Sequence, residues 1–483
     1  MTAGDLILAL DVGTSRTKAL GIDLDGRVEA EAEIETPVSY PSPGYAESQP
    51  QDWWRAASRS VRHLIRGRGM APERVRVVAL CGFMHTLVAL DAGGRPLHPA
   101  MLWSDQRSAP QTEALASVSG AVAKVTGQPL STMSSLPRLL WLRQNRPDVL
   151  EAARSFLLVK DFVRFRLTGE RATDARDARG SGLVDAATGS WSAELLSMVG
   201  IPVECMPPIL RADEICGAVS ARAARETGLR PGTPVVVGTG DWFATLVGSG
   251  CFLPERACLY LGSAGLLGAF TSAAELGRLG SIRNLASVTS TGTALSWLRR
   301  LLYSGPAGPG YDRVFAAAET SRPGARELLF LPHLMGERGG GMRPDARGAF
   351  FGLTLAHGRG DLARAVLEGT VLWLRAVSQP ALASVPFGDV LLTGGGARSG
   401  LWRRICAATF ARRVLLPASG EAAALGAAML GATAIGVGGG YQALARAWSS
   451  PVGVEEPDPD LVEAYAAVYR RFVEVEAALR PLG

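Results

Sequence analysis

The chain has 483 residues, of which 47% are hydrophobic and 20% charged, and its formal net charge is +5. A chain of this length exceeds the size at which one hydrophobic core keeps growing, so we expect two domains. The basic residues, nearly all arginine, are scattered among acids rather than gathered in a stripe, which argues against a nucleic-acid ligand.

The first predicted elements are two strands, 6–12 and 18–24, joined by a turn at Gly13–Thr17 and followed by a second turn at Asp25-Gly26. The pattern then predicts a helix near 51–67 and a strand at 74–80. A short amphipathic helix at 137–145 and a buried strand at 233–241 that ends in Gly-x-Gly-Asp complete this half. Trp53 and Trp54 are expected to pack the helix that carries them.

The second half repeats the opening pattern. The stretch 257–270 is again strand, turn and strand, with Gly262-Ser263 in the turn. A strand at 390–392, a glycine run and a helix that Ser399 caps follow, and then another strand and a small-residue helix with a Ser419 cap, in which Gly426 permits close packing. Strands that alternate with helices predict an α/β protein in two similarly built halves, with a boundary near 245–250.

The six cysteines form no C-x-x-C pair and are expected to be reduced, buried thiols of a cytoplasmic protein. The N-terminus has neither a basic stretch nor a cleavage-like site, so no signal peptide is predicted. No apolar run is long and uninterrupted enough to span a bilayer, because even the Ala-rich stretch 421–439 contains Glu421 and five glycines.

The first turn combines a carboxylate with small hydroxyl residues. Gly13, Thr14 and Ser15 offer backbone N–H groups and hydroxyls to a phosphate without bulky side chains. The adjacent Asp11 would repel a phosphate unless a cation such as Mg²⁺ lies between them. Two interpretations therefore fit this segment equally: a Mg²⁺–nucleotide corner, or a hairpin in which Asp11 is a turn residue.

Three glycine-containing turns follow apolar strands: 13–15, 262–263 and 394–396. Together they favour a nucleotide held between two lobes. They are not a Walker A loop, because no G-x-x-x-x-G-K-[ST] surrounds them. The third is a poor dinucleotide fingerprint, because Ser399 occupies the last glycine position and no acid ends the next strand. A dehydrogenase is disfavoured on this ground.

Asp241 is the sharpest single candidate, because it ends a strand behind Gly238 and Gly240. In phosphoryl transfer to a hydroxyl, an aspartate orients the acceptor and takes its proton. The alternative is a helix cap for the stretch that follows. His85 alone fits a satisfied core residue better than a ligand. The stretch LWSDQR at 102–107 is either a polyol contact or a solvated loop, and Glu337-Arg338 is favoured as structural.

The chain contains, in this order, the stretches DVGTSRTK, YAESQPQDWW, FMHT, LWSDQR, VKDFVRFRLTGE, GTGD, LGSAG, FLPHLMGER, LLTGGGARS and SGEAAALGAA. Taken together, they resemble the FGGY carbohydrate kinases nearly end to end, and among these kinases the xylulokinases. The resemblance implies two actin-like, ribonuclease-H-like domains, a sugar-binding and catalytic one at 1–247 and a nucleotide-binding one at 248–483. It implies ATP, Mg²⁺ and a small sugar bound in a central cleft, no nucleic-acid or membrane partner, and a homodimer as one possible assembly.

The resemblance also implies a role for each matching position. Asp241 matches the catalytic base, Asp11 the acid near Mg²⁺ and the phosphates, and both match metal-site positions. The remaining implied site residues are the sugar contacts Met84, His85, Trp103 and Trp242, the phosphate turns Gly13, Thr14, Ser15, Gly262 and Ser263, and the adenosine-side residues Gly394, Gly395, Gly396, Ala397 and Glu421.

The chain departs from the xylulokinase pattern mainly on the acceptor side. Trp242 stands where asparagine is usual, Phe83 where glutamine is usual, and Arg138 where the family signature prefers lysine. The second phosphate turn reads Gly-Ser-Ala rather than Gly-Thr-Ser, and 339–342 lacks the usual Thr/Ala-Pro.

The expected activity is ATP-dependent phosphorylation of a small ketose, D-xylulose to xylulose 5-phosphate being the example, with Asp241 as base. The alternatives left open are a kinase for another ketose or polyol, and a catalytically silent sugar- or nucleotide-binding homologue. An actin- or chaperone-like ATPase shares the expected fold, but no client-binding domain or long polar linker follows residue 460.

Overall fold

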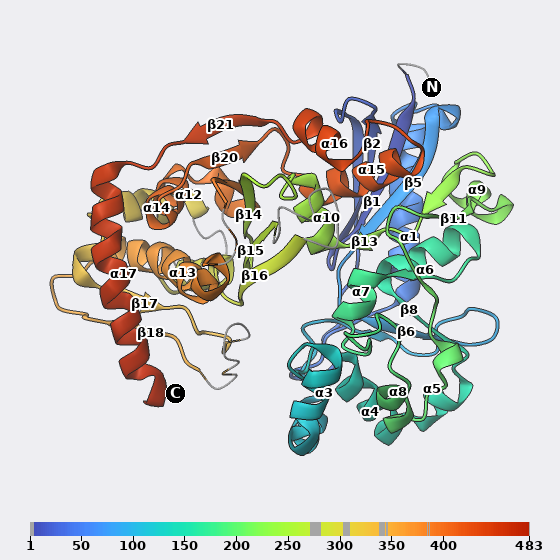
Figure 1. Cartoon of the computed structure of the whole chain (residues 1–483), viewed down its shortest axis with the longest axis horizontal. Helices are drawn as coiled ribbons and strands as arrows, with labels where there is room; N and C mark the ends of the chain where they lie inside the picture. Colours follow the sequence, from blue (N-terminus) through green and yellow to red (C-terminus); the bar gives the residue numbers. More distant parts are fainter. Residues whose placement is uncertain are drawn as a thin grey trace. The chain divides into compact units, whose positions relative to one another are not determined.

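The computed structural model describes residues 4–270, 282–302, 310–337, 343, 346–383, 385 and 387–482. The chain forms two compact α/β units (Figure 1): Met1–Gly248 with Ala423–Trp448, and Ser249–Ala422 with Ser449–Gly483. Two helices, α15 (Ala422–Ala434) and α16 (Tyr441–Trp448), therefore belong to the first unit by their contacts, although most of the second unit precedes them in sequence. That residues 1–247 bind the sugar and residues 248–483 bind the nucleotide stays a prediction.

The first unit is built on one seven-stranded sheet with the order β11-β12-β5-β1-β2-β3, and β13 pairs with β5 beside β12. The strands β1, β5, β12 and β13 run parallel, whereas β2, β3 and β11 pair antiparallel with their neighbours. The strands are β1 (Leu6–Val12), β2 (Arg16–Asp23), β3 (Val28–Glu35), β5 (Val75–Gly82), β11 (Ile215–Ala218), β12 (Pro234–Val236) and β13 (Thr239–Gly240).

Alternate residues of the central strands are buried on opposite faces of this sheet. Leu6, Leu8 and Leu10 join the core that contains Trp53 and the helices α1, α6 and α9. On the other face, a Cβ placed on Gly431 would come within 3.2 Å of Ile7 and Ala79. The helices of the sheet faces are α1 (Pro50–Arg62), α6 (Val159–Thr168), α9 (Ala221–Thr227), α10 (Asp241–Gly248), α15 (Ala422–Ala434) and α16 (Tyr441–Trp448).

A helical layer with a core of its own completes the first unit and supports the loops near the parallel strand ends. It includes α2 (Ala109–Ala114), α3 (Ser119–Thr126), α4 (Ser135–Asn145), α5 (Pro147–Ala152), α7 (Ala175–Gly180) and α8 (Ala193–Met198), with the strands β4 (Glu47–Ser48), β6 (Leu87–Leu90), β7 (Ala100–Met101), β8 (Ser155–Leu158), β9 (Thr173–Asp174) and β10 (Ile209–Leu210).

The second unit repeats the strand order of the first. Its sheet has the order β16-β15-β14-β19-β20-β21, with an antiparallel β14–β15–β16 meander, parallel β14–β19–β20 and an antiparallel edge strand β21. This matches β3-β2-β1-β5-β12-β11 strand for strand, so the echo between 6–24 and 257–270 is confirmed as a repeated topology. The strands are β14 (Arg256–Leu261), β15 (Gly265–Phe270), β16 (Ile282–Val288), β19 (Asp389–Thr393), β20 (Val414–Pro417) and β21 (Pro451–Glu455), and the short pair is β17 (Leu329–Leu331) and β18 (Ala349–Phe351).

The core of the second unit gathers around its longest helix, α13 (Arg359–Leu382), most of whose residues up to Leu374 are buried. The other helices are α11 (Gly292–Leu302), α12 (Tyr311–Glu319), α14 (Gly400–Phe410) and α17 (Pro459–Leu479). Ser399 caps α14 as predicted, since its hydroxyl accepts the Trp402 N–H at 3.3 Å. Ser419 accepts the N–H of Glu421, one residue before α15 begins. No helix in the described ranges is long and apolar enough to cross a membrane.

Candidate active site

Asp11 lies on β1 and Asp241 directly follows β13, and both of these strands pair with β5 in the first unit. Asp11 pairs in register with Cys81 on β5, and Cys81 pairs in turn with Thr239 on β13, two residues before Asp241. Because parallel strands end at the same edge of a sheet, the turn after β1, the loop after β5 and the start of α10 meet there. Residues that are 230 positions apart in the chain are thereby brought together.

The electrostatics of this edge follow from the closeness of two carboxylates. Burial, and then the negative charge of Asp11, raise the pKa of Asp241 from its usual value to about 7. Its Oδ1 accepts the N–H of Trp242 at 2.6 Å, and its carbonyl accepts the Thr245 hydroxyl at 2.9 Å, so Asp241 also starts α10. The geometry is therefore compatible with both interpretations of Asp241, as a base and as a helix cap. A carboxyl whose pKa lies near neutrality suits proton transfer better than an ordinary aspartate.

Cys81 links the Asp11 carboxylate to α15. Burial, followed by the charges of Asp11 and Asp241, raises the pKa of its thiol well above the usual value, so the S–H stays protonated. The thiol donates to Asp11 Oδ1 at 3.5 Å and lies 3.6 Å from the carbonyl oxygen of Ala423. It is one of five buried free cysteines, whereas Cys205 is only half-buried, which corrects the expectation that all six are buried.

Gly13 makes the tight turn after β1 possible. The N–H of Gly13 donates to the Arg16 carbonyl at 2.9 Å, and a Cβ on Gly13 would come within 2.7 Å of that oxygen. The hairpin therefore requires glycine at 13. Thr14 is half-buried and Ser15 is exposed, so the backbone and hydroxyl groups proposed for phosphate binding remain accessible.

Met84 and His85 lie directly after β5, against α7 and β13. A Cβ on Gly240 would meet the Met84 side chain at 2.6 Å, which places Met84 beside the residue that precedes Asp241. His85 has φ of +64°, an uncommon conformation for a residue with a side chain. Its Nδ1 lies 2.7 Å from the carbonyl oxygen of Gly180. A carbonyl only accepts, so Nδ1 carries a proton and donates it to this bond.

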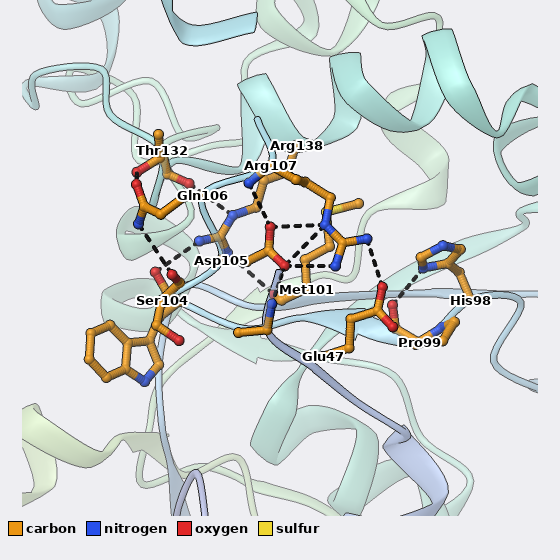
Figure 2. A network of polar contacts seen from close by, with 12 residues as sticks. Glu47, His98, Pro99, Met101, Ser104, Asp105, Gln106, Arg107, Thr132 and Arg138 are labelled. Carbon is orange, nitrogen blue, oxygen red and sulfur yellow. Dashed lines mark hydrogen bonds and ion pairs between the residues drawn. The ribbon is translucent and has the colours of Figure 1, made fainter. Parts of the chain in front are cut away.

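The loop 102–107 contains one residue that contacts the first turn and two buried residues that hold the loop in place. Trp103 Nε1 donates to the Thr14 hydroxyl at 3.2 Å, which ties this loop to the first turn. Asp105 and Arg107 are buried, and Arg107 lies between Asp105 and Glu47 with ion pairs of 2.7 and 2.6 Å (Figure 2). The Asp105-Arg107 pair is therefore internal, and a solvated loop is the wrong interpretation for these two residues.

A fully buried group of charges lies beneath α7. Lys160 Nζ lies 2.8 to 3.1 Å from carboxylate oxygens of Asp161, Asp174 and Asp177. The Thr239 hydroxyl also donates to Asp174 at 2.9 Å, so β13 and α7 share this support. Burial raises the pKa of Asp177 to about 7. The group fixes the backbone that carries Gly180 and therefore the oxygen against which His85 is set.

The predicted residues of the second unit also share one sheet edge. β14, β19 and β20 are parallel, so Gly262-Ser263, the glycine run after β19 and the segment before α15 follow their carboxyl ends. The carbonyl of Ser263 accepts the N–H groups of Thr291 and Thr293 at 3.1 Å each, at the start of α11. A Cβ on Gly396 would come within 2.7 Å of Leu261, so the glycine run adjoins the last residue of β14, the strand that leads into Gly262-Ser263. Gly394, Gly395, Ala397 and Glu421 lie at this same edge, with Gly394 at φ +86°.

The structure also shows where several residues noted in the sequence lie. Trp53 packs edge-on against Phe83 with ring centroids 5.5 Å apart, so Phe83 is a core residue rather than a polar contact. Glu337 is paired with Arg343 at 3.0 Å, which agrees with a structural role. Arg338 and 339–342 lie outside the described residues. Cys81 and Gly180 carried no recognisable signal in the sequence, and Arg138 stood out only as a departure from lysine.

The fold and this edge of the sheet define an α/β kinase of the actin-like type. The chain matches the FGGY family of carbohydrate kinases, its N-terminal domain over residues 6–248 and its C-terminal domain over residues 245–435. The chain therefore belongs to the FGGY family of carbohydrate kinases. It is a sugar kinase that transfers a phosphoryl group from ATP.

Three relatives illustrate the range within this family. The xylulose kinase of Escherichia coli (strain K12) is 34% identical over 88% of this chain and 89% of that protein. A gluconokinase of Bacillus subtilis (strain 168) is 28% identical over 89% of this chain and 88% of its own. The crystal structure of xylulose kinase from Rhodospirillum rubrum has a TM-score of 0.86 at 31% identity and covers 99% of both chains.

Proposed function

We propose that this kinase phosphorylates a small ketose, with D-xylulose converted to xylulose 5-phosphate as the first candidate. The observation that carries the proposal is the pair of carboxylates at one sheet edge, Asp241 with a pKa of about 7 beside Asp11. The family supplies ATP as the donor, and the xylulose kinase relatives favour a ketopentose acceptor.

In this proposal Asp241 orients the acceptor hydroxyl and takes its proton, while Met84, His85 and Trp103 line the acceptor side. His85 Nε2 accepts a hydrogen bond from a sugar hydroxyl, because Nδ1 is committed to Gly180. Most of the rate enhancement comes from positioning and charge neutralisation, as in other phosphoryl transfers. Exclusion of water from the bound nucleotide limits wasteful hydrolysis.

Mg²⁺ fits this set of residues. Two neighbouring carboxylates raise each other's cost of ionisation, and Mg²⁺ is typically bound through one or two carboxylates together with substrate phosphates and water. Among the described residues there is no group of three or more His, Cys, Asp or Glu side chains that could hold a metal independently of a nucleotide. Asp11 and Asp241 would hold the ion, which supplies charge neutralisation at the transferred phosphoryl group.

The nucleotide side of the proposal assigns the 13–15 turn of the first unit and the 262–263 turn of the second to the phosphates. Gly394, Gly395, Gly396, Ala397 and Glu421 would receive the adenosine. The support for these assignments is their arrangement at sheet edges and the accessible N–H and hydroxyl groups at Thr14, Ser15 and Ser263.

A second acceptor class, an aldonate such as gluconate, is favoured by two observations. Trp242 replaces the asparagine usual in xylulokinases, and a gluconokinase aligns over most of the chain. A large ring in place of a compact hydrogen-bonding side chain reshapes the space beside Asp241.

One experiment tests both the reaction and the acceptor. ADP release would be measured with pentuloses, hexuloses, tetritols, glycerol and gluconate, for the wild-type protein and for Asp241→Asn. We expect a ketopentose to give the highest kcat/KM, and the substitution to lower kcat by at least about 10²-fold because general base and ion ligand are both lost. Near-wild-type phosphorylation by Asp241→Asn would show that the role assigned to Asp241 is wrong.

A further inference from the structure

One buried guanidinium joins the two loops that form the proposed sugar wall. Arg138 lies on α4 and is 5% exposed. Its Nη2 donates to the carbonyl of Trp103 at 3.0 Å, and its Nη1 donates to the carbonyls of His85, at 2.5 Å, and Met101, at 3.4 Å. Its Nε donates to the Thr132 carbonyl at 2.9 Å (Figure 2). A single side chain thus bonds four backbone oxygens on three separate segments.

Two of these oxygens belong to residues of the proposed acceptor side, His85 and Trp103. His85 is held at φ +64°, a conformation that persists only where surrounding contacts determine it. Its ring bonds Gly180 and its carbonyl bonds Arg138, so the residue is fixed from both ends. The Trp103 carbonyl bonds Arg138 and its indole bonds Thr14 in the first turn. A displacement of Arg138 would therefore reach the histidine and the tryptophan together.

Arginine suits this position through its shape. A guanidinium has five N–H donors in a rigid plane, whereas an ammonium presents three donors from one atom. Lysine, which the family pattern prefers here, cannot bond carbonyls on three segments in the same way. The neighbouring Arg107 serves a different purpose, because it neutralises Asp105 and Glu47 rather than bonding the wall.

We propose that Arg138 is a positioning residue for the sugar acceptor: it holds His85 and Trp103 in register with each other, and so determines how tightly the acceptor hydroxyls are bound. The proposal rests on the proposed function, because it takes these two residues as the acceptor wall. It concerns acceptor binding and leaves the ATP-binding residues unaffected.

The test compares Arg138→Lys and Arg138→Met with the wild type and with a control, Arg143→Met. Arg143 is on the same helix, is exposed and makes a single bond to the Met198 carbonyl at 2.8 Å. We expect Arg138→Met to raise the KM for the accepted sugar by about tenfold or more, because small displacements of positioning groups are costly, while the KM for ATP stays within about twofold. Arg138→Lys should fall between, and Arg143→Met should match the wild type.

Arg138→Met leaves buried carbonyls unbonded and could fail to fold, so Arg138→Lys, which keeps the charge, is the deciding variant. A folded Arg138→Lys protein with wild-type sugar KM overturns the proposal. So does an equal rise in the KM values of sugar and ATP, since that indicates general destabilisation.

A second measurement separates this proposal from the proposed function. Hydrogen exchange of backbone amides in 83–87 and 102–106 should quicken in Arg138→Lys and stay unchanged in Arg143→Met. If the wild-type protein phosphorylates no sugar in the panel, the proposed function fails, and the exchange measurement alone decides: unchanged exchange in both segments overturns the role of Arg138.

Discussion

The contact of α15 with α10 gives the most specific prediction, Gly426→Ala. A Cβ built on Gly426 would lie 1.8 Å from the carbonyl oxygen of Ala244 and 2.8 Å from the N of Gly248. Ordinary contact begins at 3.4 Å, so the two helices would have to separate by about 1.6 Å. The obstacles are backbone atoms, and no change of rotamer relieves them.

The opposite side of α15 offers no room for that separation. A Cβ on Gly431 would already lie 3.1 Å from Val77 and 3.2 Å from Ala79 and Ile7 on the sheet. Overpacking typically costs 1–3 kcal/mol where side chains can shift. With backbone on one side and the sheet on the other, we expect Gly426→Ala to lower the free energy of unfolding by about 3 kcal/mol, even after the helix-propensity gain of about 1 kcal/mol.

The same displacement should reach the chemistry, because α10 begins at Asp241. We therefore expect kcat to fall by about tenfold or more in the folded fraction of Gly426→Ala. Urea unfolding and steady-state ADP release measure the two effects. Gly420→Ala is the matched control, since nothing lies within 4 Å of its added Cβ. A Gly426→Ala protein as stable and as active as the Gly420→Ala protein would refute the reasoning.

Two further predictions concern buried charge. Arg107→Met strands the buried Asp105 and the partly buried Glu47, and should lower the free energy of unfolding by about 3–5 kcal/mol in urea titrations, whereas an exposed pair such as Arg146–Asp148 should matter little. Burial, and then the charge of Arg343, lower the pKa of His333 from 6.5 to about 4, so the unfolded chain binds this proton more tightly. The stability that neutral His333 contributes is present above pH 6.5 and is lost as the pH falls toward 4, by about 3 kcal/mol in all. Unfolding curves of His333→Gln should lack that part of the pH dependence. An unchanged pH dependence would show that other groups cause it.

The sequence predicted the elements whose signals are local. The β1–β2 hairpin, β5, the β14–β15 hairpin and the Ser399 cap were all visible, because alternating burial and capping side chains leave short-range patterns. The two-unit α/β fold was also predicted, and the family match confirms it. The helix near 51–67 ends earlier, at Arg62, and continues as a π-helical turn over His63–Gly67.

What the sequence could not provide was the set of long-range partners. No residue near Asp11 in the sequence predicts that Cys81 and β13 lie beside it, because strand pairing depends on the whole sheet. Arg138 was visible only as a departure from lysine, because its acceptors are backbone oxygens and carry no residue identity. Gly426 was recognised as a close-packing position, but its partner Ala244 lies in a distant segment. The functional roles of the site residues stay predictions.

The return of α15 and α16 to the first unit affects how this protein can be divided. The chain leaves that unit after Gly248 and contributes Ala423–Trp448 to it only after building most of the second (Figure 1). A fragment that stopped at residue 248 would expose the apolar sheet face around Ile7 and Val77 and strip Cys81 of the Ala423 carbonyl. During synthesis, the sheet edge that carries Asp11 and Asp241 therefore stays incomplete until the ribosome has passed strands β14 to β20 of the second unit. The first unit therefore cannot be completed until most of the second has been made, although its first strand is made first.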